Sequence, residues 1–415
     1  MTRQVYLDNN ATTMPAPEVV EEMLPFFTEK YGNPSSIHTF GSSVAGDIDL
    51  ARERVAQLFN CTPSEVVFTS CGTESNNYAL RGAAGAQPEK THIITTMVEH
   101  PAILTTCRSL QRRGYNILEL PVDRKGRLDL DRLAEAITDQ TLVVTVMYAN
   151  NETGTVFPVE KVGEIVKSRG CLFHIDAVQV PGKLPVDVNK IPADMISISA
   201  HKFHGPKGVG ALYVRRGTRL RRFMTGGHQE RGRRGGTENV PGVVGMGKAC
   251  ELAISSIEEE RKIVAARRDS LEQGILKAIP NCAINGDIES RLPNTTNIGF
   301  EFIEGEAILL MMDRKGISAS SGSACTSGSL EPSHVLRSMG VPFTYAHGSV
   351  RLSLSRYTVD ADVDTVLEHL PPIIRRLREL SPFSADHAPV DPSAGRSEGR
   401  HEADVGQQRG EAERV

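Results

Sequence analysis

The sequence predicts an α/β protein: a large domain with a mostly parallel sheet covered by helices on both faces, plus a smaller α+β domain. Three observations support this prediction. Short runs rich in β-branched residues alternate with helical stretches through the first two thirds of the chain. These runs are apolar on both faces, which is typical of strands in a buried parallel sheet. The 415 residues also exceed the ~250 to 300 that one core usually supports, so two domains are expected.

Six short runs are expected to form the strands of the large domain. Between two of them, the segment 158–170 (PVEKVGEIVKSRG) has the apolar spacing of an amphipathic helix. Helical connections of this kind join parallel strands, because the chain must return to the same end of the sheet. In chain order the expected strands are 65–70, 91–97, 141–147, 171–176, 195–199 and 210–214.

Beyond Gly247 the pattern becomes that of the smaller α+β domain. A charged helical stretch at about 248–279 leads to a second alternation of strands and helices, which ends in a long helix near 360–380. The last segment has four Arg, seven acidic residues and few bulky apolar ones, so it cannot offset its ordering entropy. The expected organisation is an N-terminal segment joining the small domain (1–14), the large domain (15–255), the small domain (256–381) and a disordered tail (382–415).

Composition and charge exclude several classes of protein. With 47 basic and 51 acidic residues, the formal net charge of −4 would recruit neither nucleic acid nor an anionic membrane. No uninterrupted apolar run approaches the ~18 residues of a membrane helix. The start of the chain, MTRQVYLDNNATT, lacks the basic and apolar regions of a secretory signal. We therefore expect a cytoplasmic protein.

One segment is strongly basic. Residues 215–234 contain eight Arg and one acidic residue, Glu230. A solvated face or a subunit edge is the simplest interpretation. Nucleic acid binding is disfavoured, because no aromatic platform interleaves with the arginines and the segment is rich in glycine, like a loop that grips a small anion.

The cysteines predict a reduced protein with one unusual thiol. No two of the seven are closer than ten residues, so neither a zinc knuckle nor a CxxC redox pair is expected. Most should be inert core residues. Cys325 differs, because the Ser- and Gly-rich stretch 320–334 is too small and polar to bury it. It is a candidate nucleophile, with an incidental loop cysteine as the alternative.

The residues that follow the strands indicate where a ligand binds, because ligands of open parallel sheets lie at the carboxyl ends of the strands. After the first strand comes CGTESNN, in which Gly72 and Thr73 open a helix. Free N–H groups at a helix start can hold a phosphate, although simple capping is the commoner use of such residues. Asp176 ends the strand 171–176 and Gln179 follows it. Such an acid either caps a turn or holds a protonated ring nitrogen.

Lys202 lies immediately beyond the strand 195–199, close to Ser199, His201 and His204. A lysine pressed into such a position should have a depressed pKa, as lysines that bond covalently to a cofactor need. A surface lysine at a strand end is the alternative. A metal site at the two histidines is disfavoured, because no nearby acid or cysteine completes a ligand set.

Taken together, these side chains describe a site for pyridoxal 5′-phosphate. Lys202 would attach the cofactor, and Asp176 would keep its ring nitrogen protonated. The segment VEHPA (98–102) offers a side chain to stack on the ring. Further along, Arg351 has the fork geometry that clamps a substrate carboxylate, with a strand-edge ion pair as its alternative. The cofactor phosphate would lie on Thr73, Ser199 and His201.

At this point the sequence resembles the class V, fold-type I pyridoxal phosphate enzymes, and within them the cysteine desulfurases of the NifS type. The resemblance extends from about residue 4 to residue 381. Ten motifs support it, and coincidence in all ten is implausible. They are YLDNNATT, GNPSSIH, TSCGTESNN, VEHPA, ANNETG, DAVQ, SAHKFHGPKG, GGHQERGRRGGTEN, SSGSACTSGSLEPSH and VRLSLSRY.

The resemblance implies a role for residues that the pattern alone does not explain. His100 would stack on the cofactor ring and belong to the catalytic residues, and Gly72 would belong to the cofactor site. Thr237 would reach the phosphate of the neighbouring subunit, which implies a homodimer with the Arg-rich segment at its interface. The ring hydroxyl would contact Asn151 and Gln179, and the substrate would bind to Arg351 and Asn33.

The implied activity is cysteine desulfuration, which converts L-cysteine to L-alanine and leaves the sulfur as a persulfide on Cys325. The run GGHQERGRRGGTEN and the short cysteine loop are similar to the nitrogen-fixation branch. That similarity implies iron–sulfur cluster assembly for nitrogenase maturation with a NifU-like scaffold as sulfur acceptor, where Cys325 would transiently ligate the cluster. The alternatives are another class V enzyme, such as a selenocysteine lyase or an aminotransferase, and a non-catalytic sulfur carrier.

Overall fold

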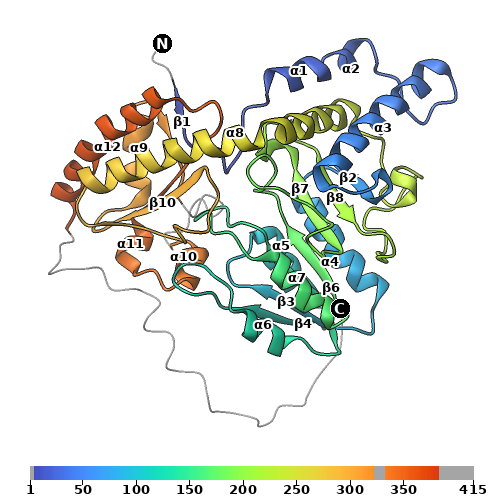
Figure 1. The fold of residues 1–415 in the computed structure, drawn as a ribbon, viewed down its shortest axis with the longest axis horizontal. Coiled ribbons are helices and arrows are strands. Elements are labelled where there is room, and N and C mark those ends of the chain that lie inside the picture. The colour runs from blue at the N-terminus through green and yellow to red at the C-terminus, as the bar shows by residue number, and fades with distance from the viewer. Residues whose placement is uncertain (1–3, 322–331, 383–415) are drawn as a thin grey trace, which may run out of the picture.

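A seven-stranded sheet forms the centre of the computed structural model, which describes residues 4–321 and 332–382 (Figure 1). Cys325 and residues 383–415 of the predicted tail lie outside the described residues. The strands are β2 (Val66–Thr69), β3 (His92–Thr96), β4 (Asn116–Leu120), β5 (Thr141–Met147), β6 (Leu172–Asp176), β7 (Met195–Ser199) and β8 (Gly210–Val214).

The sheet is mostly parallel, as predicted. Its strand order is β2-β8-β7-β6-β5-β3-β4. Every neighbouring pair from β7 to β4 is parallel, whereas β8 runs antiparallel to both of its neighbours. Six of the seven strands therefore point the same way, and their carboxyl ends meet along one edge.

All six predicted strands are present, and the sequence prediction missed β4. The missed strand lies at the edge of the sheet, and its side chains alternate between exposed and more buried positions. Its residues, NILEL, therefore lack the continuous apolar character by which the buried strands were recognised. The α/β class itself is confirmed.

Helices cover both faces of this sheet. On one face, α4 (Gly72–Ala86) and α5 (Pro101–Gln111) pack in a core with Ile93, Val143 and Met195. On the other face, three helices pack in a core with Ile94, Val144 and Ile196. Successive strand residues thus enter opposite cores, which is why the strands are apolar on both faces. The three helices are α3 (Thr39–Phe59), the predicted α7 (Val159–Ser168) and α8 (Val240–Ala278).

The remaining helices of this part are short. The helices α1 (Pro17–Met23) and α2 (Pro25–Thr28) precede α3, and α6 (Leu130–Ala136) follows β4. Three 3-10 turns complete it: η1 (Pro63–Glu65), η2 (Ala200–Lys202) and η3 (Glu230–Gly232). Lys202 is the last residue of η2, directly after β7.

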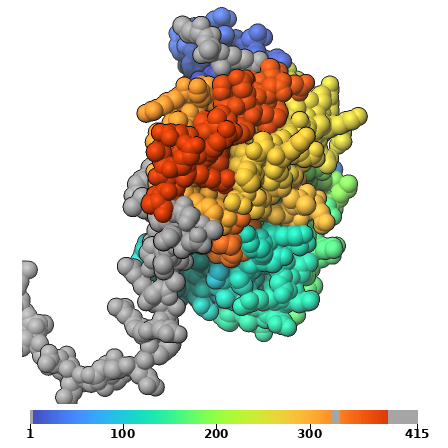
Figure 2. Space-filling model, turned by 90° about the vertical axis from the view of Figure 1, so that its left-hand side faces the viewer, coloured from blue at the N-terminus to red at the C-terminus, as the bar shows by residue number. Residues whose placement is uncertain are grey.

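A second core lies beside the first. Its antiparallel sheet has the order β12-β10-β9, with β9 (Cys282–Ile284), β10 (Thr295–Phe300) and β12 (Ser349–Ser353). The N-terminal strand β1 (Val5–Tyr6) pairs in parallel with β11 (Ile317–Ser318). Figure 2 shows the last helix, α12 (Asp360–Leu380), lying along α8. The helices are α9 (Gly305–Asp313), α10 (His334–Ser338), α11 (Phe343–His347) and α12 (Asp360–Leu380).

The helix α8 connects the two cores, and Figure 1 shows it crossing the molecule from one to the other. Val243 and Met246 in its first half pack in the core of the large sheet, whereas Leu271 and Ile275 pack in the second core. The predicted domain boundary at 255 falls inside this helix and stays a prediction.

In the described part of the chain, α8 is long and apolar enough to span a membrane, but 56% of its most apolar window is buried in the protein, which is typical of a core helix.

Two glycine substitutions should have opposite effects on stability. In Gly247→Ala the new Cβ would lie 2.7 Å from Ala51 Cα, so α3 and α8 would have to separate, at a cost of about 1–3 kcal/mol. Gly46→Ala is the matched control, because no neighbouring atom lies within 4 Å of its new Cβ. It should stabilise α3 by up to about 1 kcal/mol. Thermal unfolding measures both changes, and an unchanged midpoint for Gly247→Ala would contradict the close helix packing.

Candidate active site

A cavity of about 330 Å³ lies at the carboxyl edge of the large sheet. The ends of five strands that point the same way, and the segments that follow them, supply most of its lining, as expected for an open parallel sheet. Its volume is in the range of small-molecule sites. Ten of the predicted site residues line it: Gly72, Thr73, His100, Asn151, Asp176, Gln179, Ser199, His201, Lys202 and Arg351.

The first turn of α4 forms one end of the cavity. Its N-cap residue, Cys71, makes no side-chain capping bond. A Cβ on Gly72 would lie 2.6 Å from Val178 Cγ2, so only glycine lets the backbone approach this closely. The hydroxyl of Ser199 is buried and has no hydrogen-bond partner among the described residues. Backbone N–H groups, a positive helix end and a hydroxyl without a partner fit an anionic group such as a phosphate.

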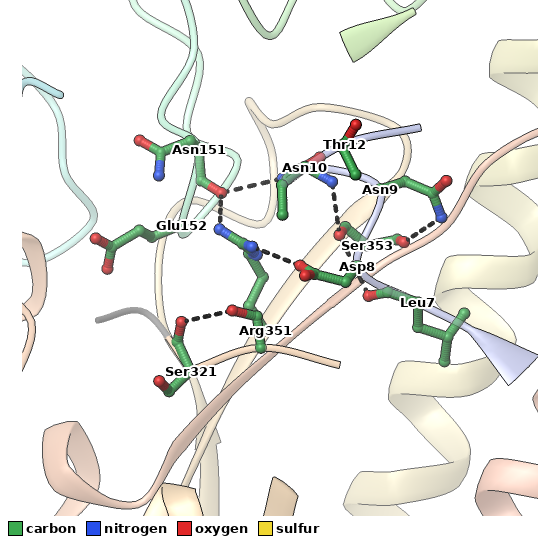
Figure 3. A network of polar contacts seen from close by, with 12 residues as sticks. Leu7, Asp8, Asn9, Asn10, Thr12, Asn151, Glu152, Ser321, Arg351 and Ser353 are labelled. Carbon is green, nitrogen blue, oxygen red and sulfur yellow. Dashed lines mark hydrogen bonds and ion pairs between the residues drawn. The ribbon is translucent and has the colours of Figure 1, made fainter. Parts of the chain in front are cut away.

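Lys202 projects from η2 toward the N-terminal segment. Its Nζ donates to the carbonyl oxygens of Asn10, at 2.6 Å, and Ala11, at 2.7 Å. The sequence prediction missed Asn10 as a site residue, although it belongs to the motif YLDNNATT. Its side chain donates to Asn151 O and Thr295 Oγ1, and its backbone N–H donates to Ser353 Oγ (Figure 3).

Asp176 presents a buried carboxylate at the end of β6. Its Oδ2 accepts from Asn76 Nδ2 at 2.7 Å, and its Oδ1 accepts from Val178 N at 3.1 Å. Asn76 was also missed, but the sequence held a signal for it. It lies four residues after Gly72, one turn further along the same face of α4. A carboxylate fixed in this way can accept from the protonated nitrogen of a ring bound in the cavity.

His100 is the N-cap of α5. Its Nδ1 accepts from Ala102 N at 3.1 Å, so in the neutral ring the proton is on Nε2. Burial lowers the pKa of His100, and the positive charge of Lys202 lowers it further, while Asp176 opposes both. A neutral imidazole therefore faces the cavity at neutral pH.

Glu99, directly before His100, is fully buried. Its Oε1 accepts from Thr96 Oγ1 at 2.8 Å and from Met147 N at 2.9 Å, which ties the loop to the ends of β3 and β5. Burial raises the pKa of Glu99 to about 8, and the nearby charge of Asp176 also raises it. The acid is therefore mostly protonated at neutral pH. The sequence prediction did not assign a role to this residue.

Gln179 has one satisfied and one free polar atom. Its Nε2 donates to Asn10 O at 2.9 Å, whereas its buried Oε1 has no partner among the described residues. An acceptor without a partner beside the cavity fits a hydroxyl donor on a bound ring. Asn151 lines the same region, and its backbone oxygen accepts from Asn10 and Arg351.

Arg351 reaches the cavity from β12, in the second core. Its Nη2 donates to Asp8 Oδ1 at 2.7 Å and its Nη1 to Asn151 O at 3.0 Å, as Figure 3 shows. The guanidinium is buried, and its Nε has no partner among the described residues. Arg351 therefore forms an ion pair and also lines the cavity, and its role as a substrate clamp stays a prediction.

Three predicted site residues are not among those that line the cavity. Asn33 and Thr237 are exposed and do not line the cavity, and Cys325 is outside the described residues. His201 does line it, and burial lowers its pKa to about 4. His204 lies behind the cavity, where its ring contacts Tyr357 edge to face. The assignments of these residues stay predictions.

The Arg-rich segment is anchored by two ion pairs, one partly buried and one buried. Arg234 donates to both carboxylate oxygens of Glu74, in the first turn of α4, at 2.9 and 3.1 Å. Glu230 accepts two bonds from Arg52, at 2.7 and 2.8 Å. The arginines at 216, 219, 221 and 222 are exposed. The segment is therefore fixed next to the cavity and leaves part of its positive charge on the surface.

Known proteins are similar to this chain in fold and in sequence. The sequence model of the class-V aminotransferases matches residues 5–366. A cysteine desulfurase of Trichormus azollae is 60% identical over 384 residues, covering 92% of this chain and 96% of that protein. Cysteine desulfurase NifS of Azotobacter vinelandii is 54% identical over 388 residues, covering 93% and 96%. A solved NifS-like protein superposes with a TM-score of 0.86 at 40% identity and covers 90% of this chain and 100% of that one.

The variant Glu99→Gln should gain stability relative to the wild type as the pH rises. The raised pKa of Glu99 contributes stability that is fully present below about pH 4.5 and is lost as the pH rises through about 8. Glutamine does not titrate, so the free energy of unfolding of the variant relative to the wild type should increase by about 1 kcal/mol or more from about pH 6 to about pH 9. Urea unfolding measures it. Glu258→Gln, at a side chain that is 85% exposed, is the control. A constant difference for Glu99→Gln would contradict a protonated Glu99.

Proposed function

The chain belongs to the class-V aminotransferase family and is an enzyme of the cysteine desulfurase type, and we propose that it converts L-cysteine to L-alanine with transfer of the sulfur to Cys325. One observation supports the proposal most: the catalytic lysine, the ring-contacting residues and the carboxylate clamp inferred from separate motifs line a single cavity. Their convergence is what such a reaction requires, since the cofactor and the amino acid must be held side by side.

Pyridoxal 5′-phosphate is the cofactor that the cavity fits. Ser199 and the first turn of α4 with Gly72 and Thr73 would hold its phosphate, together with His201. Asp176 would bind the ring nitrogen, and Gln179 and Asn151 the ring hydroxyl. When bound, this cofactor supplies a sink for the electron pair left on the substrate Cα. The polar atoms of Ser199 and Gln179 that have no partner among the described residues support this assignment.

Lys202 and His100 have different roles in the proposed reaction. Lys202 would attach the cofactor and then, as an unprotonated amine, remove the proton from the substrate Cα. Its bonds to the Asn10 and Ala11 oxygens hold the amine at the N-terminal segment. His100 would pack on the ring as a neutral imidazole that carries its proton on Nε2.

Arg351 would bind the substrate carboxylate, with Asn33 as a further contact. The guanidinium is held by Asp8 and the Asn151 oxygen, so its orientation is set before the substrate binds. Burial strengthens its attraction for a carboxylate, because little water competes for its donors.

Cys325 would accept the sulfur. Its thiolate forms a bond to the substrate sulfur as the Cβ–S bond of the substrate breaks, and a proton is delivered to Cβ. The enzyme thiol becomes a persulfide and the three-carbon product leaves as L-alanine, so no outside oxidant or reductant is needed. The six described cysteines are all free, which suits the proposed cytoplasmic, reducing location.

We further propose a homodimer. The exposed apolar side chains Leu24, Phe27, Tyr31 and Ile37 gather within residues 24–37, and Phe223 and Met224 are more than a third exposed in the Arg-rich segment. Such surfaces mark interfaces. A second copy placed there would bring the exposed Thr237 toward its phosphate site, and sedimentation velocity can measure the assembly.

We propose that a NifU-like scaffold accepts the sulfur and that the enzyme serves nitrogenase maturation. Cys325 would transiently ligate the iron–sulfur cluster on that scaffold. The support is the high identity to the NifS protein of Azotobacter vinelandii over most of both chains.

The spectrum of the purified protein tests the function. The protein should be yellow, and its visible spectrum should change when L-cysteine is added. In the presence of a reducing thiol it should form alanine together with sulfide. In Cys325→Ala the colour should remain but alanine formation should fall by more than about a hundredfold, because the sulfur acceptor is missing. Cys282→Ala, at a half-buried thiol in β9, is the matched control. Keto acid without alanine would instead indicate an aminotransferase, alanine from selenocysteine alone would indicate a selenocysteine lyase, and a normal rate for Cys325→Ala would refute the acceptor role.

Arg351→Lys should mainly impair substrate binding. Lysine keeps the positive charge but loses the fork of donors, so KM for L-cysteine should rise about tenfold or more, while the cofactor spectrum stays that of the wild type. Steady-state kinetics measure KM and kcat separately. An unchanged KM would assign Arg351 to the ion pair with Asp8 alone.

A further inference from the structure

A buried lysine, Lys183, lies behind Lys202. Lys183 follows β6 and is 8% exposed. Its Nζ donates to the backbone oxygens of Gln179, at 3.0 Å, and Lys202, at 3.1 Å. Both acceptors belong to residues that line the active-site cavity. Within residues 4–321 and 332–382, no carboxylate lies within ion-pair distance of Lys183. The fold therefore buries an ammonium group against the backbone of two site residues.

A small cavity of about 20 Å³ separates this part of the site from the second core. Both lysines line it, with His204, Glu260 and Arg356. It has room for about one water molecule. The carboxylate of Glu260 is 2.7 Å from Arg356, so the charges of this pair offset each other and leave Lys183 as the excess cation. The net charge that faces Lys202 from this side is therefore positive.

On the other side, the active-site cavity presents charges of both signs to Lys202. Asp176 is negative and Arg351 positive, whereas burial lowers the pKa of His100 and of His201, so that both rings are neutral. An ammonium on Lys202 would be stabilised by Asp176 and destabilised by Lys183. Without Lys183, the carboxylate would favour the protonated lysine, which cannot act as a nucleophile or a base.

Lys183 itself shows this mutual repulsion. The pKa of Lys183 is lowered to about 8, mainly by burial; the charge of Glu260 raises the pKa and the charge of Lys202 lowers it. It is therefore mostly protonated at neutral pH. Coupling of this kind is reciprocal, so the charge of Lys183 must act on Lys202 as strongly as Lys202 acts on Lys183.

We propose that Lys183 is a positioning residue for Lys202: its ammonium group fixes the backbone oxygens of Gln179 and Lys202, and its charge favours the unprotonated Lys202 amine. A neighbouring cation is a recognised means of activating a lysine. The inference rests on the proposed function, because it concerns how the cofactor-binding lysine is kept reactive. Lys183 touches neither substrate nor cofactor, and it acts through Lys202.

The test is a pH titration of the lysine side chains in the full-length protein, labelled with ¹³C-lysine and freed of cofactor. The Cε resonance reports the protonation of each amine. In Lys183→Met, which keeps the side-chain stem, the midpoint of the Lys202 titration should rise by about one pH unit. The fraction of unprotonated Lys202 below the midpoint should therefore fall about tenfold. With cofactor bound, the pH midpoint of the change in the visible spectrum should rise in the same direction. Lys207→Met is the matched control, because that exposed charge is screened by water and should move Lys202 much less.

A Lys202 midpoint that stays within about 0.2 pH units in folded Lys183→Met would overturn the inference. If that variant does not fold, the reciprocal measurement decides. In Lys202→Met the midpoint of Lys183 should rise, and an unshifted Lys183 would equally overturn the coupling. These results are independent of the proposed function. A Lys202→Ala variant that keeps the wild-type cofactor spectrum would refute the role of Lys202 in the proposed function, whereas the titrations of the wild-type and Lys183→Met proteins would still test the coupling of the two amines.

Discussion

The active site depends on how the N-terminal segment is held between the two cores. The side chain of Asn10 is almost completely buried and bonds to Asn151 beside the large sheet and to Thr295 in β10. Its backbone oxygen accepts from Lys202 and Gln179. Every polar atom of a buried segment needs a partner, so these bonds fix the segment in one position. The cavity wall, Lys202 and Arg351 are positioned together as a result.

Burial then determines the charge of the site. The pKa of His201 falls to about 4 and that of Glu99 rises to about 8, in both cases because burial disfavours the charged form. Glu152, fully buried beside Arg351, has its pKa raised to about 7 by the same cause. The charged groups that remain around the cavity are Asp176 and Arg351, which are both held by hydrogen bonds, and the lysines. A site with few charges lets each of them act over a short, poorly screened distance.

Structural and functional roles coincide in several residues. His100 caps α5 through Nδ1, and the same bond leaves its Nε2 proton facing the cavity. Arg351 forms an ion pair with Asp8, and that pair fixes the guanidinium in the orientation that the proposed binding of a substrate carboxylate requires. Gly72 permits close packing against Val178, and its position opens the helix start to an anion. In each case the interaction that stabilises the fold also prepares a group for chemistry, so the two interpretations drawn from the sequence are compatible.

The sequence by itself determined the α/β class, the six buried strands and the residues at their carboxyl ends. These properties follow from local pattern, because a strand buried on both faces is apolar throughout and parallel strands end at one edge. The edge strand β4 lacked that pattern and was missed. Only the tertiary structure decided the roles of Asn10, Asn76 and Lys183. Asn10 and Asn76 meet residues a hundred or more positions away, and Lys183 acts on Lys202 from behind the cavity. No local periodicity marks Asn10 or Lys183, and the helical spacing from Gly72 indicates only the face of α4 on which Asn76 lies, not its partner. Burial, which sets their partners and the charges around Lys202, arises only when the two cores pack on either side of the N-terminal segment.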